Sequence, residues 1–194
     1  MRRTLTVVAA LAAFAAGGPA SAGQILDGAR ARGALACGVG TGTAGYMLAD
    51  STGKWRGLSV DVCRAVAAAI FGDAEKVKYV PLTSQQRFTA LQSGEVDMLV
   101  GNATWTLTRD TALGLDFTGV YYYDGQGFLV PKKLGVKSAR ELSGATVCVA
   151  PGTTTELNLA DYFRANKMTF KPVVIEKVDE IRAAFFAGRC DVYT

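Results

Sequence analysis

One short segment of this chain occurs twice, and this repeat constrains the fold more than any other feature. Ala90–Met98 and Ala184–Val192 share the same order of residue types, with a glycine followed three positions later by an aspartate. Each copy has the pattern of a helix end, a glycine C-cap and the start of a strand. The repeat predicts two similar α/β lobes with a cleft between them rather than one continuous sheet.

The first half of the chain alternates between predicted strands and helices. Apolar runs at Ala34–Val39, Val77–Pro81 and Val96–Val100 predict buried strands. Helical patterns lie between them, so the order is β-α-β-α-β. This order favours a mainly parallel sheet flanked by helices, with its ligand crevice at the carboxyl ends of the strands.

Both intervening helices have recognisable starting signals. Ser59 is expected to cap the first, and Thr83 with Gln86 forms a capping-box pattern for the second. The first helix is expected to bury a stripe at intervals of four residues, namely Val62, Val66 and Ile70. In the second half, apolar runs predict strands at Phe128–Val130, Ala145–Ala150, Phe170–Ile175 and Cys190–Tyr193.

The amino terminus predicts export. Arg2 and Arg3 precede an apolar run from Leu5 to Ala16, and small residues follow up to Ala22. This is the pattern of a cleavable secretory signal over residues 1–22, and its apolar run is too short to span a bilayer. Loss of its two arginines lowers the net charge from +4 to +2. The remaining Lys and Arg residues are scattered among acids, so nucleic acid is not expected as a partner.

Histidine is absent, and the chain contains four cysteines. The absence of histidine excludes histidine-based triads and the commonest zinc sites. The cysteines also lack the CxxC spacing that would indicate a metal centre. No cofactor or metal is therefore expected. In an exported protein the cysteines are expected to be paired or buried. Three full pairings are possible and the sequence does not choose among them; our working guess pairs them within lobes, Cys37 with Cys63 and Cys148 with Cys190.

Two threonine-rich segments are candidate anion sites. Asn102–Arg109 follows a predicted strand and gathers an amide, three hydroxyls, an indole and a guanidinium, which suit a carboxylate. Thr153–Thr155 opens a predicted helix, whose free N–H groups also favour anions. Simpler explanations remain for both segments. Arg109 could pair with a neighbouring aspartate, and the threonines could do no more than cap the helix.

Several motifs together resemble the periplasmic amino-acid-binding proteins that serve ABC importers, in the two-lobed type II fold. The likeness is strongest to the branch with broad L-amino-acid specificity. The segments that carry it are Asp61–Val66, Asn102–Arg109, Tyr122–Phe128, Pro151–Glu156 and Cys190–Thr194.

The resemblance implies a role for six residues. In this family the arginine at the position of Arg109 holds the ligand α-carboxylate, with Thr104 and Asn102 at neighbouring polar contacts. Thr154, with Thr153 beside it, matches a threonine that closes on the same carboxylate from the second lobe. Tyr46 is the candidate aromatic cover for the ligand side chain. The implied protein is periplasmic and monomeric, binds an L-amino acid and delivers it to an ABC transporter permease.

The resemblance also implies domain limits. Lobe one is expected over residues 23–127 and lobe two over residues 128–194, with an interlobe crossing at Gly125–Val130. The family carries an aspartate for the ligand ammonium just beyond the position of Thr194, so the chain is expected to be a fragment with lobe two incomplete. In addition, the turn at Gly57–Ser59 lacks the aromatic residue that often stands there in the family.

Two alternatives use the same fold. The first is an exported dehydratase of a cyclic carboxylic acid, which would need a general acid or base. Without histidine this burden falls on Asp, Glu or Lys, and none stands inside the site motif before Arg109. We therefore do not expect an enzyme. The second alternative is the ligand-sensing domain of a receptor, which would require a transmembrane segment beyond Thr194.

Overall fold

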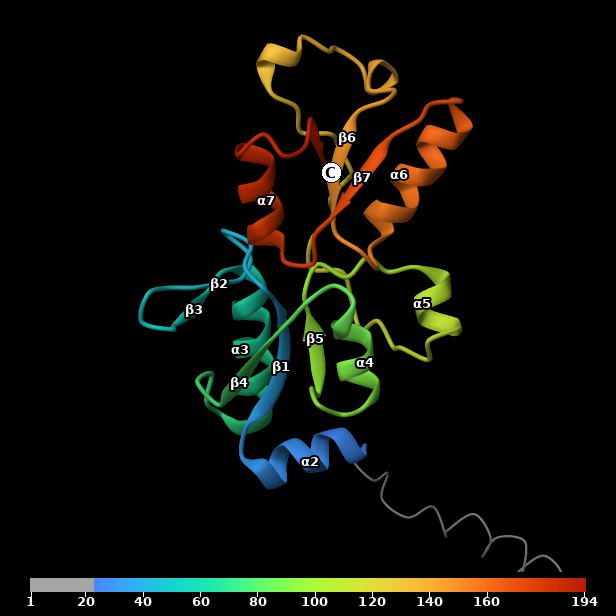
Figure 1. The fold of residues 1–194 in the computed structure, drawn as a ribbon. Coiled ribbons are helices and arrows are strands. Elements are labelled where there is room, and N and C mark those ends of the chain that lie inside the picture. The colour runs from blue at the N-terminus through green and yellow to red at the C-terminus, as the bar shows by residue number, and fades with distance from the viewer. Residues whose placement is uncertain (1–22) are drawn as a thin grey trace, which may run out of the picture.

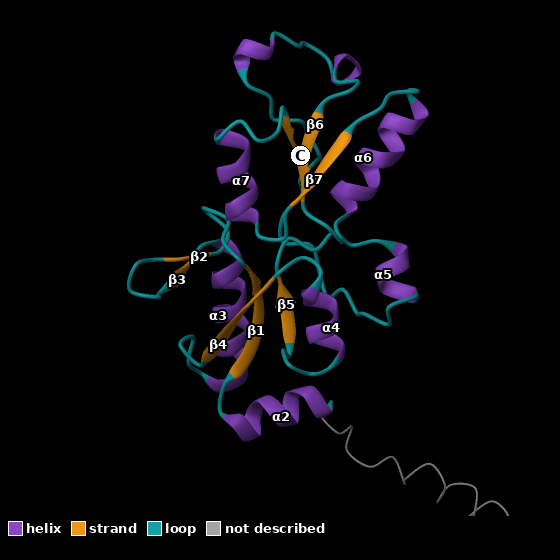
Figure 2. Ribbon diagram, viewed as in Figure 1, coloured by secondary structure: helices purple, strands orange, loops and turns teal. Residues whose placement is uncertain are grey.

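The computed structural model describes residues 23–194, so the signal expected over residues 1–22 lies outside the described residues. The described chain forms two three-stranded parallel sheets flanked by helices, and one two-stranded hairpin. Figure 1 shows one sheet with its helices above the other, and Figure 2 shows the loops that run between them. The predicted α/β class with two similar units is confirmed. Among residues 23–194, no helix has the length and apolar character needed to cross a membrane.

The first sheet has β1 (Leu35–Gly40) at its centre, between β4 (Val77–Leu82) and β5 (Met98–Val100). Both neighbours run parallel to β1, as the β-α-β-α-β order predicts. Four of the six residues of β1 carry apolar side chains and all four are buried, because helices cover both faces of a parallel sheet. Its helices are α2 (Gln24–Arg32), α3 (Leu58–Phe71) and α4 (Gln86–Gln92).

The start of α3 differs from the prediction that Ser59 caps it. Gly57 is the N-cap, with φ 120°, and a Cβ there would lie 2.4 Å from the Tyr46 carbonyl oxygen. Leu58 and Ser59 donate their backbone N–H groups to the carbonyls of Gly45 and Tyr46, at 3.0 and 2.9 Å. The preceding loop therefore satisfies the first turn, and a side-chain cap is not needed.

The buried face of α3 is also rotated from the predicted stripe. Val62, Val66 and Ile70 are only partly buried, whereas Val60, Cys63 and Ala67 are buried. Cys63 forms a disulfide with Cys37 of β1, which fixes this face of the helix against the sheet. Apolar spacing alone did not reveal that tether.

The segment between the sheets contains little regular structure. It holds α5 (Leu107–Thr111) and two short 3-10 helices, η2 (Lys132–Leu134) and η3 (Ala139–Glu141). The strand predicted at Phe128–Val130 is reduced to a single bridge, in which Leu129 pairs with Tyr193 at 2.8 and 3.0 Å. The hairpin of β2 (Leu48–Ala49) and β3 (Trp55–Arg56) was not predicted, because each strand has only two residues.

The second sheet repeats the order of the first. Its central strand is β6 (Thr146–Val149), between β7 (Lys171–Val174) and β8 (Val192–Tyr193), and both neighbours run parallel to it. The helices α6 (Thr154–Ala165) and α7 (Val178–Phe186) lie on either side of this sheet (Figure 1). The two central strands therefore occupy equivalent places in their units.

The repeated aspartate does the same work in both units. Asp97 accepts a hydrogen bond from the Ala36 N–H at 2.7 Å, and its own N–H donates to the Ala36 carbonyl at 2.8 Å. Asp191 is bonded to Thr146 in the same two ways, at 2.8 and 2.9 Å. Each aspartate thus fastens the start of an outer strand to the start of the central strand. The repeat seen in the sequence is a repeat of structure.

Each cysteine pair lies within its own unit, one in the first and one in the second. Cys37 bonds Cys63, with Cα atoms 6.2 Å apart, and Cys148 bonds Cys190, with Cα atoms 5.7 Å apart. The working guess among the three pairings is confirmed. All four cysteines are buried, and one cysteine of each pair stands in a central strand, so each disulfide fastens a core rather than a surface loop.

Candidate functional site

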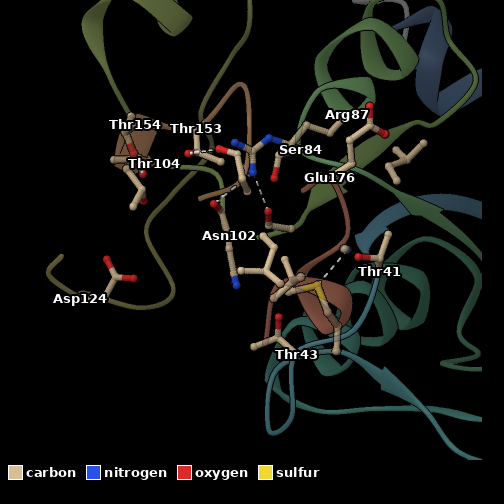
Figure 3. A pocket seen from close by; sticks show the side chains of 18 of the residues that line it. Thr41, Thr43, Ser84, Arg87, Asn102, Thr104, Asp124, Thr153, Thr154 and Glu176 are labelled. Atoms are coloured by element: carbon tan, nitrogen blue, oxygen red, sulfur yellow. Dashed lines mark hydrogen bonds between the residues drawn. The ribbon is translucent and has the colours of Figure 1, made fainter. Parts of the chain in front are cut away.

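A cavity of about 500 Å³ lies between the two sheets. Its lining includes residues at or just after the carboxyl end of every strand of both sheets, namely Thr41, Ser84, Asn102, Ala150, Glu176 and Thr194. Figure 3 labels four of these residues, Thr41, Ser84, Asn102 and Glu176. The carboxyl ends of the two sheets therefore face one another. This is the position expected for a ligand crevice in parallel α/β units.

Four of the six predicted site residues line this cavity. Asn102 and Thr104 come from the loop after β5, while Thr153 and Thr154 come from the start of α6. The hydroxyls of Thr104 and Thr154 lie 3.0 Å apart and are hydrogen-bonded across the space between the sheets (Figure 3). The two threonine-rich segments, which are 50 residues apart, thus meet at one edge of the cavity.

The start of α6 has the capping chemistry that the sequence predicts. The Thr153 hydroxyl accepts a hydrogen bond from the Glu156 N–H at 3.0 Å. The Glu156 carboxylate accepts from the Gly152 N–H at 2.9 Å, one residue earlier than in a standard capping box. Thr153 therefore caps the helix, and Thr154 at its first position carries the hydroxyl that reaches Thr104.

Arg109 is buried and does not line the cavity. Its guanidinium donates a hydrogen bond to the Thr104 carbonyl at 2.8 Å and lies 4.8 Å from the centre of the Phe88 ring. Burial lowers the pKa of Arg109 from its ordinary value. In this arrangement Arg109 supports the backbone of the Thr104 loop from the side that does not line the cavity.

Arg87 is the basic residue that lines the cavity, and the sequence analysis did not single it out. It is only 5% exposed, and its guanidinium donates to the carbonyls of Gly101 and Asn102 at 3.0 and 3.2 Å. Burial, and then the charge of Arg109, lower the pKa of Arg87 to about 10. This value is still far above neutrality, so the group stays charged. The sequence signal that could have identified Arg87 as a site residue is its place in the first turn of α4, just after the end of β4.

No carboxylate among residues 23–194 forms an ion pair with Arg87 or Arg109. The Nε atom of Arg87 is also buried without a hydrogen-bond partner. A buried cation that lacks a counter-charge carries a desolvation cost, which an anion entering the cavity would offset. The cavity side of Arg87 is therefore suited to a negatively charged group.

Tyr46 lies in a second cavity of about 440 Å³ that adjoins the first. The two cavities share Asn102, Thr104 and Asp124 as lining residues. Tyr46 packs edge-on against Tyr122, with ring centroids 5.2 Å apart, and interaction with the Tyr122 side chain is the main cause that raises the pKa of Tyr46 to about 12. Tyr46 thus belongs to an aromatic wall beside the main cavity rather than to its lining.

Gln126 is a second cavity residue that the sequence analysis missed. Its amide N–H₂ donates to the Thr155 carbonyl at 3.0 Å and to the Thr194 hydroxyl at 3.1 Å, and its oxygen accepts from Asn158 at 3.1 Å. It therefore connects the segment between the sheets to the start of α6 and to the residue after β8. Within the described residues, no group of three or more His, Cys, Asp or Glu side chains is placed to hold a metal ion.

Residues 35–192 match the family of bacterial extracellular solute-binding proteins, family 3. The general L-amino acid-binding periplasmic protein AapJ of Rhizobium johnstonii is 55% identical over 192 residues, which are 99% of this chain and 56% of that protein. The glutamate/glutamine/aspartate/asparagine-binding protein BztA of Rhodobacter capsulatus is 58% identical over 185 residues, which are 95% of this chain and 54% of that protein. The chain thus spans about half the length of these curated relatives.

A solved structure has the same fold. It is an ABC transporter periplasmic binding protein from Brucella ovis with glutathione bound, and it has 58% sequence identity and a TM-score of 0.84 over 89% of this chain and 54% of that chain. The predicted two-lobed type II periplasmic-binding-protein fold is confirmed by this likeness. The names of the family and of these relatives are those of binding proteins rather than enzymes. The chain belongs to the bacterial extracellular solute-binding proteins, family 3.

Proposed function

We propose that this chain forms the ligand-binding part of an exported periplasmic protein that captures L-amino acids and delivers them to an ABC importer. The observation that carries this proposal is the meeting of two threonine-rich segments, one from each sheet, at one edge of an interlobe cavity that the buried Arg87 also lines. The relatives named as amino-acid-binding periplasmic proteins support the same ligand class and compartment.

We take residues 23–127 as lobe one and residues 128–194 as lobe two. In this proposal Arg109, Thr104 and Asn102 bind the ligand α-carboxylate from lobe one, and Thr154 and Thr153 close on it from lobe two. Arg109 does not line the cavity in this structure, so this proposal requires its guanidinium to reach the carboxylate beside the Thr104 loop. It donates to the Thr104 carbonyl through one guanidinium nitrogen, which leaves further donors for a carboxylate. Tyr46 would cover the ligand from the adjoining aromatic wall.

Arg87 is assigned a different part of the ligand. Its guanidinium faces the cavity from α4, whereas Arg109 lies behind the Thr104 loop. We infer that Arg87 favours ligands with a second negative group, such as the side-chain carboxylate of L-glutamate or L-aspartate. Neutral amino acids would leave it with its two carbonyl partners only.

The ligand is bound and released without chemical change in this proposal. Among residues 23–194, the acids that line the cavity are Asp124 and Glu176. A thermal-shift screen of the full-length protein against the common L-amino acids tests the proposed ligand class, because a ligand that binds only the folded state raises the melting temperature. A full-length protein whose melting temperature responds to none of them would contradict the proposal.

A further inference from the structure

One hydrogen bond joins the two lobes at a place remote from the threonine pair. Arg182 of α7 donates from its guanidinium to the backbone carbonyl of Gly42 at 3.1 Å, across 140 residues of sequence. Gly42 belongs to the loop that follows β1, and its neighbours Thr41 and Thr43 line the main cavity. Arg182 itself does not line that cavity. The bond therefore acts on the cavity wall from outside.

The Gly42 carbonyl needs such a partner. Gly42 is buried, and a buried backbone carbonyl without a hydrogen bond is costly. The loop is held to lobe one on its other side, where Thr43 and Met47 exchange backbone hydrogen bonds at 2.7 and 2.9 Å. Arg182 supplies the tie from lobe two. Within residues 23–194 it forms no ion pair that would compete for its guanidinium.

We propose that Arg182 is a positioning residue that holds the closed form of this protein together and keeps the Thr41–Thr43 wall in place. It binds a carbonyl of lobe one from α7 of lobe two, whereas the threonine pair acts at the start of α6. The threonine pair and the bonds of Gln126 to Thr155 and Asn158 all act at α6, so Arg182 adds resistance to hinge opening from a second helix. The inference rests on the proposed function in so far as closure traps a ligand.

The consequence is a contribution to affinity without ligand contact. The Arg182 bond joins the two lobes, so opening of the lobes would break it, and its free energy therefore favours the closed state. A ligand that binds the closed state has an apparent affinity proportional to the closed population. Loss of the bond should then weaken binding by raising the dissociation rate of the ligand, because the rate at which the ligand associates with the open form is unchanged.

The test compares Arg182→Ala, Arg182→Lys and Arg164→Ala in the full-length protein, with L-glutamate as the probe. Arg164 is a matched control, because it is an exposed arginine of lobe two whose one ion-pair partner within residues 23–194 is Asp161. We expect the Kd of Arg182→Ala to rise about tenfold through a faster dissociation rate, with Arg182→Lys partly restored and Arg164→Ala unchanged. A dissociation rate of Arg182→Ala equal to that of the wild type would overturn the proposal. If Arg182→Ala does not fold, Arg182→Lys and Arg182→Gln carry the same comparison.

A second readout separates this proposal from the ligand assignment. If the wild-type protein does not bind L-glutamate, the ligand assignment fails, and the closed form must then rest on contacts between the lobes alone. In that case, hydrogen exchange at the Thr43 amide, which is bonded to the Met47 carbonyl, reports whether the Arg182–Gly42 hydrogen bond stabilises this loop. Faster exchange in Arg182→Ala than in Arg164→Ala supports the role of Arg182. Equal exchange in the two variants overturns it.

Discussion

Two arginines stack on one phenylalanine ring, but only one of them lines the cavity. The guanidinium carbons of Arg87 and Arg109 each lie 4.8 Å from the centre of the Phe88 ring. Cation–π contact with the ring partly offsets the cost of burying two like charges so close together. Arg87 faces the cavity and Arg109 braces the Thr104 loop. Substitutions at these two positions should therefore have different consequences.

Arg109→Ala in the full-length protein should weaken binding of every L-amino acid. Loss of one partner of a desolvated charge pair commonly costs about 2 to 5 kcal/mol, which corresponds to a rise in Kd of about thirtyfold to several thousandfold. Within this range we expect the Kd to rise at least about a hundredfold. Isothermal titration calorimetry measures the change. Arg140→Ala is the control, because Arg140 is exposed on η3. Near wild-type affinity in Arg109→Ala would remove Arg109 from the proposed site.

Arg87→Met should change selectivity more than overall affinity. The substitution keeps an unbranched apolar side chain over the stem of the arginine and removes the guanidinium charge that faces the cavity. We expect the affinity for L-glutamate to fall at least about tenfold more than the affinity for L-alanine, because only glutamate brings a second carboxylate. Competition titrations with the two ligands measure this ratio. An equal loss for both would show that Arg87 only supports the backbone of Gly101 and Asn102.

At the level of elements, each disulfide stabilises a different junction. The first joins β1 to α3 across 26 residues, and the second joins β6 to the residues before β8 across 42 residues. Restriction of the unfolded chain by loops of these lengths is worth about 3 to 4 kcal/mol each. We expect the paired substitutions Cys37→Ala/Cys63→Ala and Cys148→Ala/Cys190→Ala to lower the free energy of unfolding by about this amount in urea titrations. A loss below about 1 kcal/mol would contradict the chain-entropy account.

The repeated aspartate gives a prediction about pH. The Thr146 hydroxyl and then its N–H donate to Asp191 and lower the pKa of this carboxyl. A lowered pKa in the folded state means that the stabilisation is complete above the unfolded-state pKa of about 3.9 and is lost as the pH falls through the folded-state pKa. Asp191→Asn should therefore be destabilising at pH 7, with the gap to wild type shrinking in more acid solution. Urea titrations at neutral and at acid pH measure this gap, and a gap that does not depend on pH would argue against an ionised Asp191.

At the scale of the whole molecule, Gly152 is a point of close approach between the lobes. It has φ 71°, and a Cβ there would lie 3.3 Å from Cγ and 3.5 Å from Cα of Gln85 in lobe one. Gly152→Ala should therefore hinder closure and raise the Kd for L-amino acids several-fold, in addition to its backbone strain of about 1 to 2 kcal/mol.

Gly135→Ala is the matched control for this substitution. Gly135 has φ 70°, and no heavy atom of residues 23–194 outside its immediate neighbours lies within 4 Å of the position that a Cβ would take there. It therefore carries the same backbone strain without the interlobe contact. Calorimetry on the two variants isolates the steric effect on closure, and small-angle scattering with ligand present reports whether the lobes stay apart. Equal affinities in the two variants would show that closure tolerates a side chain at position 152.

Most of the fold was predictable because it depends on local patterns. Runs of apolar residues, glycine C-caps and capping boxes act within a few neighbouring residues, so they indicate the strands of both sheets and most helices. The exceptions depend on distant partners. The carbonyls of Gly45 and Tyr46, more than ten residues before α3, cap that helix, and the bond between Cys37 and Cys63 sets which face of α3 is buried.

The sequence by itself determined the α/β class and the repeat of its units. It also pointed to six candidate site residues, of which four line the cavity. Tertiary structure alone decided that Thr104 and Thr154 meet, that Arg87 rather than Arg109 faces the cavity, and that Arg182 reaches Gly42. The physical reason is that helix and strand signals arise from neighbours along the chain. The direction in which a long arginine side chain points depends on the packing of segments that are far apart in sequence.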